Sequence, residues 1–264
     1  SRHTRSAAPR ASPLKSKAPS ATITSCPASA SVRARCAPTN PAPPIRSARA
    51  TGGQSAMLWP MAVPVSPQSP AGNVYDKYDS GNPLVRRMLS GFFSTLDELV
   101  ARAGPESLLD VGCGEGIVTE RLARRIGDGA VAGIDRDAGE LVEHWNARPS
   151  IAFQVGDACA LPFPDDAFDM VSLIEMLQLV PDHQLALREA RRVARRWVLV
   201  TTPCEPLWRT MNVARGAYVL QRGNTPGHVH HFSFRGIQRE LAPHGQIVAA
   251  RRALPWSLAL LNVS

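Results

Sequence analysis

Apolar residues between Leu84 and Val100 recur mostly at intervals of three and four positions. This spacing predicts an amphipathic helix, with one face packed on the rest of the protein. Asn82-Pro83 gives a turn signal before the helix, and Gly104-Pro105 predicts its end.

Short apolar runs then alternate with helical stretches. We expect strands at 107–111, 130–134, 151–155, 169–174 and 197–201, and helices at 117–126, 138–146 and 182–194. Strict alternation of strand and helix predicts a parallel sheet with helices on both faces. The runs are apolar along their whole length, as expected for strands buried between two helical layers.

The last part of the chain has a different order. A helix is expected at 234–241, followed by apolar runs at 247–253 and 256–261 that are separated only by Leu254-Pro255. A parallel crossover needs a dozen or more residues, so this link predicts an antiparallel hairpin. The predicted fold class is α/β, Rossmann-like, with a mostly parallel sheet.

The N-terminal segment is compositionally distinct. Residues 1–70 are rich in Ala, Ser, Pro and Arg and have few large apolar side chains, so we expect them to be disordered. Three interpretations of this segment remain open: a transit peptide, a natural tail, or translated upstream sequence with the true start at Met57 or Met61.

This segment also explains the net charge of +8. Residues 1–75 contain nine Lys and Arg residues and no Asp or Glu, which leaves 21 basic and 22 acidic residues in the remainder. The remainder therefore gives no strong signal for a nucleic-acid partner.

The five cysteines are odd in number, lie far apart and form no CxxC pair, so we expect neither a disulfide framework nor a zinc site. No apolar run reaches the ~20 residues that a membrane span needs. We expect a cytoplasmic protein without a transmembrane segment.

The sharpest chemical feature is the sequence LLDVGCGEG at residues 108–116. A buried strand here runs into a glycine-rich turn that opens a helix, and glycine lets a ligand approach the main chain closely. Dinucleotide-binding folds use a similar turn, but their GxGxxG pattern would need a glycine where this chain has Ile117. The spacing here is GxGxG.

Two acidic residues follow at the ends of the next two predicted strands. Asp135 could accept both hydroxyl groups of a ribose, and Asp157 could accept an adenine amino group. Either residue alone is more often a turn or cap residue. Acids at the ends of consecutive parallel strands, together with the glycine turn, indicate a ligand site, because ligands bind beyond those ends.

The series LLDVGCGEG, GID, GDA and LPFPDDAFDMVSLIEMLQLVPD resembles class I S-adenosylmethionine-dependent methyltransferases of the ubiquinone/menaquinone C-methyltransferase-like, type 11 group. The resemblance covers roughly residues 73–264, preceded by the disordered segment 1–70. It implies a seven-stranded sheet with an antiparallel last strand and S-adenosyl-L-methionine as cofactor. The cofactor-binding residues that we expect are Asp110, Gly112, Cys113, Gly114, Gly116, Asp135, Arg136, Asp157 and Ala158.

Within this resemblance, Asp135 would hold the ribose, and Asp157 with the Ala158 backbone would hold the adenine. Glu175 stands at the position of a glutamate that lies near the cofactor in the family. Many relatives carry a Glu-His pair where this chain has Gln178-Leu179. This difference weakens any acid/base role carried over from them.

A histidine-rich segment, residues 223–233, follows the fifth predicted strand, where the family builds its substrate wall. We expect His230 or His231 to be the candidate base, with Glu175 also in the catalytic set. Metal binding by His228, His230 and His231 is the weaker alternative.

The leading hypothesis is methyl transfer to an O, N or C atom of a small-molecule or lipid-linked acceptor. The rivals are an RNA or DNA methyltransferase and a catalytically silent cofactor-binding or scaffold protein. The sequence does not predict the oligomeric state.

Overall fold

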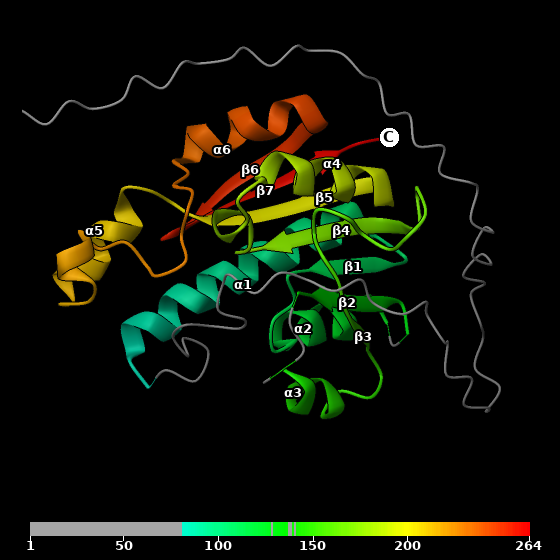
Figure 1. The fold of residues 1–264 in the computed structure, drawn as a ribbon, viewed down its shortest axis with the longest axis horizontal. Helices are drawn as coiled ribbons and strands as arrows, with labels where there is room; N and C mark the ends of the chain where they lie inside the picture. Colours follow the sequence, from blue (N-terminus) through cyan, green and yellow to red (C-terminus); the bar gives the residue numbers. More distant parts are fainter. Residues whose placement is uncertain (1–80, 128, 137–138, 140) are drawn as a thin grey trace, which may run out of the picture. The chain divides into compact units, whose positions relative to one another are not determined.

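Seven strands form one sheet in the part of the chain that the computed structural model describes, residues 81–127, 129–136, 139 and 141–264. Their order is β3-β2-β1-β4-β5-β7-β6 (Figure 1). The strands are β1 (Leu108–Val111), β2 (Val131–Asp135), β3 (Ala152–Val155), β4 (Phe168–Ile174), β5 (Ala194–Pro203), β6 (Gln246–Ala253) and β7 (Trp256–Asn262).

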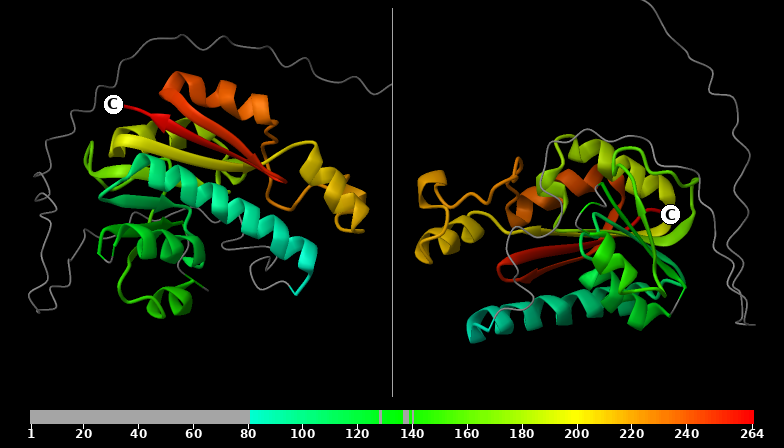
Figure 2. Two further views of the ribbon diagram at one scale, coloured as in Figure 1. Left: turned by 180° about the vertical axis from the view of Figure 1, so that it is seen from behind. Right: turned by 60° about the horizontal axis from the view of Figure 1, so that its bottom comes forward.

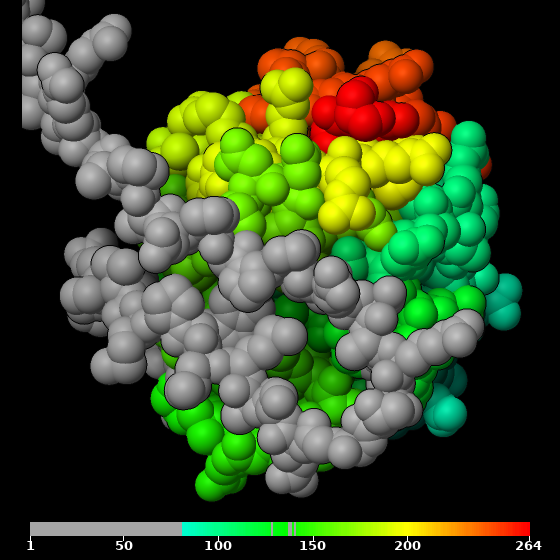
Figure 3. Space-filling view, turned by 90° about the vertical axis from the view of Figure 1, so that its right-hand side faces the viewer, coloured from blue at the N-terminus to red at the C-terminus, as the bar shows by residue number. Residues whose placement is uncertain are grey.

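Five neighbouring strands of this sheet are parallel, as predicted. β7 is inserted between β5 and β6 and runs antiparallel to both, which confirms the hairpin expected from the short Leu254-Pro255 link. The last residues of the chain lie directly against the start of β5, where Trp197 pairs with Asn262 (Figure 3).

Helices cover both faces of the sheet (Figures 1 and 2). The α-helices of the described residues are α1 (Pro83–Ala103), α2 (Ile117–Ile126), α3 (Val142–Asn146), α4 (His183–Val193), α5 (Leu207–Ala214) and α6 (Phe234–Leu241), of which α5 lies beyond the end of the sheet. Consecutive side chains of β1 point to opposite faces: Leu108 packs with α1 and α2, whereas Leu109 packs with α4 and α6. This double burial explains why the strands read as continuous apolar runs.

The ends of the predicted helices have local causes. The side chain of Asn82 accepts the amide proton of Leu84 at 2.9 Å and caps α1, and Gly104 ends that helix in the left-handed region at φ 56°. Asp182 caps α4 in the same way, by accepting from the amide of Leu185.

Two predicted elements differ from the structure, and one segment contains helices that were not predicted. The described part of the helix expected at 138–146 is limited to α3, and β5 is twice as long as the strand expected at 197–201. Pairing with β7 continues from Trp197 to Pro203, so the partner strand sets the carboxyl end of β5. The segment after Pro203, for which no pattern was found, contains α5 and a short 3₁₀ helix, η2 (Val219–Gln221).

The expectations for residues 1–70 and for a domain boundary near residue 73 lie outside the described residues. Of the helices that the structure describes, none is both long enough and apolar enough to cross a bilayer.

Candidate functional site

The glycine-rich turn lies at the carboxyl end of β1. Gly112, Gly114 and Gly116 have φ angles of 74°, 52° and 78°, in the left-handed region that favours glycine. Gly116 is the N-cap of α2, so the turn leads directly to the positive end of a helix. The amides of Gly112, Cys113 and Gly116 donate to main-chain carbonyls and that of Gly114 to Asp135, so what the turn provides is a main chain without side chains that a ligand can approach closely.

Asp135, at the end of β2, holds this turn in place. One carboxylate oxygen accepts the Gly114 amide proton at 2.8 Å, and the other accepts the Arg136 amide proton at 2.7 Å. From α3, the Trp145 indole N–H donates to the Gly114 carbonyl at 2.8 Å. Each carboxylate oxygen has two lone pairs, so Asp135 can hold the turn and still accept from ligand hydroxyl groups.

Asp110 is buried beneath the turn. It accepts hydrogen bonds from the hydroxyl groups of Thr119 and Ser172, both at 2.7 Å. Burial raises the pKa of Asp110 from 3.8 to about 6, and the Asp135 charge adds to this, although the two hydroxyl donors act in the opposite direction. Asp110 therefore links β1, α2 and β4 below the site, in addition to lining it.

The surroundings of Cys113 argue against a role as a nucleophile. Burial raises the pKa of its thiol well above the ordinary value, and the nearby carboxylates of Asp110 and Asp135 raise it further. The thiol is therefore protonated at neutral pH and has a packing role.

Asp157 begins the loop between β3 and β4. Its side chain accepts the Cys159 amide proton at 2.8 Å, which fixes a tight turn and orients the carboxylate. Asp157 is exposed, and its carboxylate lines the same opening as the glycine turn.

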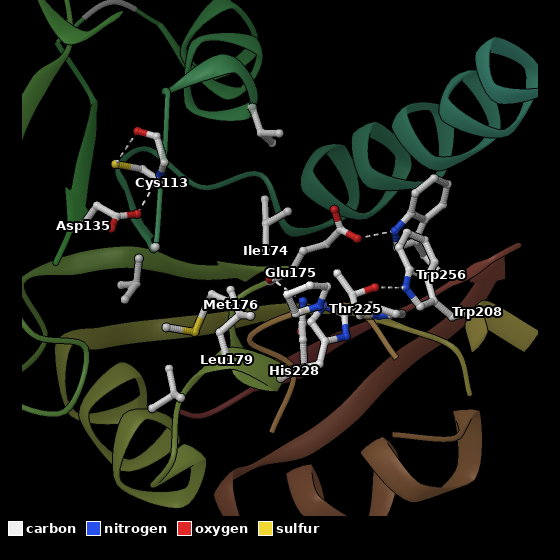
Figure 4. Close-up of a pocket in the computed structure, with 18 of the residues that line it drawn as sticks. Cys113, Asp135, Ile174, Glu175, Met176, Leu179, Trp208, Thr225, His228 and Trp256 are labelled. Atoms are coloured by element: carbon white, nitrogen blue, oxygen red, sulfur yellow. Dashed lines mark hydrogen bonds between the residues drawn. The ribbon is translucent and has the colours of Figure 1, made fainter. Parts of the chain in front are cut away.

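A cleft of about 900 Å³ joins these features. Eight of the nine expected cofactor residues line it: Asp110, Gly112, Cys113, Gly114, Asp135, Arg136, Asp157 and Ala158. Gly116 does not, and contributes through the conformation of the turn instead. In Figure 4, Cys113 and Asp135 lie at one end of the view and Trp208 and Trp256 at the other.

The Trp208 end of the cleft is apolar and was not predicted. It is lined by Leu84, Val85 and Met88 of α1, by Trp208 and Met211 of α5, and by Trp256 of β7. Trp208 and Trp256 have ring centroids 5.9 Å apart, and the Trp208 indole N–H donates to the Thr225 hydroxyl at 2.9 Å. No local pattern could reveal this wall, because its residues come from three distant segments.

Glu175 lies between the two ends of the cleft. It has a positive φ of 54°, and its amide donates to the carbonyl of Thr201 at 3.1 Å. Its carboxylate accepts a hydrogen bond from the Trp256 indole N–H (Figure 4). Glu175 thus belongs to the cleft wall, and its place near a bound cofactor stays a prediction.

His230 and His231 are not brought to this cleft. They line a separate pocket with His183 and Glu205. A ring nitrogen of His230 lies 3.3 Å from His183 and 3.0 Å from the Pro181 carbonyl. The structure therefore brings neither residue to the cleft, and a role of either as the base stays a prediction that this arrangement does not support.

His228 is the histidine of this segment that does line the cleft. The amides of Val229 and His230 both donate to the Gln178 carbonyl, at 2.8 and 3.2 Å, and this contact fixes where the loop turns. The sequence could not separate the three histidines, since the contact that does so is tertiary. Within the described ranges, no three His, Cys, Asp or Glu residues are grouped so that they could hold a metal.

Residues 109–198 match a family model described as a methyltransferase domain. This part of the chain is therefore similar to a methyltransferase domain. The matched residues of the domain run from β1 to β5 and include the glycine turn, Asp135 and Asp157.

Two curated methyltransferases are similar to the domain. The ubiquinone/menaquinone biosynthesis C-methyltransferase of Hahella chejuensis is 37% identical over 150 residues, which are 50% of this chain and 59% of that protein. A demethylmenaquinone methyltransferase of Beutenbergia cavernae is 34% identical over 159 residues, 58% of this chain and 64% of that protein. The chain thus spans about three fifths of the length of these relatives.

Solved structures agree with the fold. Magnesium protoporphyrin IX methyltransferase from Synechocystis superposes with a TM-score of 0.52 at 18% identity, over 71% of this chain and 91% of that one. A protein of Pyrococcus horikoshii gives a TM-score of 0.55 at 18% identity, over 72% of this chain and 97% of that one. At this identity the likeness supports the seven-stranded methyltransferase fold alone.

Proposed function

We propose that the protein transfers a methyl group from S-adenosyl-L-methionine to a small apolar acceptor. One observation carries the proposal: a single cleft joins a polar end, with the glycine turn, Asp135 and Asp157, to an apolar end with two tryptophans. Such a division suits one polar cofactor and one apolar substrate placed end to end.

The polar end fits the cofactor chemically. Asp135 lies at the end of β2, where its carboxylate would accept ribose hydroxyl groups, and Asp157 with the Ala158 backbone would hold the adenine. S-Adenosylmethionine, when bound, supplies a methyl group on a positively charged sulfur. The carboxylates of Asp135 and Glu175 line the cleft and favour a cationic ligand there.

The protein's part in the reaction is mainly to align the acceptor and to exclude water. The apolar wall around Trp208 and Trp256 does both. Where the acceptor must lose a proton, Glu175 and His228 are the titratable residues that we assign to this step, because both line the cleft.

The names of the two relatives favour a quinol-like or other lipid-linked acceptor and methylation at carbon. The apolar wall is consistent with a substrate that has an extended hydrocarbon part. A nucleic-acid acceptor is less consistent with it, because Leu84, Val85, Met88 and Met211 offer a phosphate-bearing ligand no polar partner.

Calorimetric titration of the full chain with S-adenosylmethionine, with NAD in parallel, tests the cofactor. We expect binding of the former alone. Asp135→Asn and Asp157→Asn should each weaken it at least about tenfold, since a charge-assisted hydrogen bond contributes about 1.5–3 kcal/mol. Glu98→Gln, on the exposed part of α1, is the matched control and should bind normally.

Because Asp135 also supports the turn, its variant needs a check of folding by circular dichroism. The exposed Asp157 provides an independent test that does not depend on that check. Normal affinity in a folded Asp157→Asn variant would refute the adenine assignment, and binding of NAD in place of S-adenosylmethionine would refute the proposed function.

A further inference from the structure

Two segments that border the apolar end of the cleft are basic. Residues 83–88 begin α1 and contain Arg86 and Arg87, and residues 207–223 form α5, η2 and their link and contain three more arginines. Neither segment contains an Asp or Glu. We call residues 83–88 and 207–223 together the basic rim.

The two segments of the rim lie at the same end of the domain. All three ribbon views place α5 and the first turn of α1 at the same end of the domain, where both extend beyond the sheet (Figures 1 and 2). Residues of both line the cleft, among them Leu84 of α1 and Ala214 of α5. Both segments of the rim therefore border the apolar end of the cleft.

The charge on α1 is opposite to what helix stability favours. Arg86 lies in the first turn and Arg87 follows it, and the first turn holds no acidic residue. The N-terminus of a helix carries a partial positive charge, so cations there are unfavourable in an isolated protein. An anionic surface placed against this turn would offset the repulsion.

The rim also exposes apolar side chains. Leu220 is 94% exposed, Leu84 61%, Val219 54% and Val213 42%, and these are four of the seven strongly exposed large apolar residues in the described part of the chain. Single exposed apolar residues are ordinary, but a group of them around one opening marks an interaction surface.

The α5–η2 part of the rim is held in a fixed shape. The Arg209 guanidinium donates to the Arg222 carbonyl at 3.1 Å, and the Asn212 amide group donates to the Gly223 carbonyl at 2.8 Å. Gly223 has no room for a side chain, because a Cβ would lie 2.2 Å from the Arg209 carbonyl oxygen. Leu220 is thus presented outward by a braced turn.

We propose that the basic rim docks the protein on the surface of an anionic lipid bilayer, with Leu220 and its apolar neighbours in the interface. This inference rests on the proposed function, because it would bring the mouth of the cleft to an acceptor dissolved in the membrane. Arginines would contact anionic headgroups, and the aliphatic side chains gain free energy only in an apolar medium. A nucleic acid would complement the arginines but not Leu220.

Hydrogen-exchange mass spectrometry of the full chain tests the proposal. It is performed with vesicles of phosphatidylcholine alone and with vesicles of equal parts phosphatidylcholine and phosphatidylglycerol. We expect slower exchange in peptides that cover residues 213–222 with the anionic vesicles alone. Reporting on these peptides separates the rim from residues 1–75, whose nine basic residues can attract the same vesicles.

Two variants and two matched controls sharpen the test. Leu220→Asp should abolish the protection of 213–222, and Arg222→Glu should raise the lipid concentration for half-protection at least about fivefold, because an arginine near an anionic surface contributes about 1 kcal/mol. Leu254→Asp, at another exposed apolar position, and Arg188→Glu, on α4, should behave like the unaltered protein.

Any of three results would overturn the proposal. Vesicles could protect only residues 1–75, or they could protect Leu220→Asp as well as the unaltered protein. An RNA oligonucleotide could also protect the rim where vesicles do not. Calorimetry with S-adenosylmethionine separates this result from the proposed function. If vesicles protect the rim but the protein does not bind S-adenosylmethionine, the proposed function is refuted and the docking surface is supported. If the protein binds S-adenosylmethionine but vesicles do not protect the rim, the docking surface is refuted and the proposed function is supported.

Discussion

The buried carboxylate of Asp110 predicts a specific pH dependence of stability. Its pKa is about 6 in the folded protein, against 3.8 as the ordinary value. Because the folded pKa is raised, the folded state binds the proton more tightly than the unfolded state does. Asp110 therefore contributes most to stability below pH 3.8, and that contribution is lost as the pH rises through about 6.

The difference between 3.8 and 6 corresponds to about 3 kcal/mol in total. Linkage assigns about 1.4 kcal/mol of this loss to the interval from about pH 5 to about pH 7.5. Asp110→Asn is neutral at both values and can keep one hydrogen bond each with Thr119 and Ser172. Its unfolding free energy, relative to the unaltered protein, should rise by about 1.4 kcal/mol over this interval.

Urea denaturation at a series of pH values, followed by circular dichroism, measures this difference. Subtracting the two proteins at each pH removes the titration of all other groups. Ser172→Ala is an informative companion, because the Ser172 hydroxyl lowers the pKa of Asp110, and its loss should move the pH-dependent region upward. A difference between Asp110→Asn and the unaltered protein that stays constant with pH would refute this account of the Asp110 site.

Two further predictions concern stability and the turn. Asp97 is buried on α1 and pairs with Arg121 at 2.6 Å and Arg125 at 2.5 Å. Asp97→Ala should therefore lower the free energy of unfolding, measured by urea denaturation, by about 1–2 kcal/mol. This is less than a fully buried ion pair would contribute, because both arginines are about half exposed. An unchanged urea midpoint would show that this network contributes nothing. Gly116→Ala places a Cβ 2.7 Å from the Phe153 ring at a φ of 78°. The substitution should lower the free energy of unfolding by about 1–2 kcal/mol. It should also weaken the affinity for S-adenosylmethionine measured by calorimetry. Normal affinity and stability would show that the turn tolerates another conformation.

The sequence predicted the parallel part of the fold because each element carries its own signal. The helices at 117–126 and 234–241 were placed to the residue, since their apolar spacing and end signals are local. The hairpin followed from the two-residue link at Leu254-Pro255 alone. α5 gave no such signal: its apolar residues serve the cleft and the rim, so they do not follow the pattern of a helix packed on a core.

The same distinction separates the two ends of the cleft. The cofactor end was predictable because the glycine turn, Asp135 and Asp157 each follow a strand, and parallel strands bring such positions to one edge. The acceptor end is assembled from α1, α5 and β7, which are far apart in sequence, so Trp208 and Trp256 could not be assigned to it. For the same reason the sequence could not show that His228 lines the cleft and His230 does not, because a tertiary contact with Gln178 holds this loop.

Net charge gives a further instance of this limit. Beyond residue 75 the chain has 21 basic and 22 acidic residues, and this balance argued against a polyanionic partner. Charge recognition depends on where residues lie, not on their sum. Between residues 206 and 239 there are five arginines and no acid, while acids such as Asp135 and Glu175 lie in the cleft wall. A neutral total thus hides an acidic interior and a basic rim, an arrangement that would hold a cationic cofactor inside the cleft and place the opening against an anionic surface.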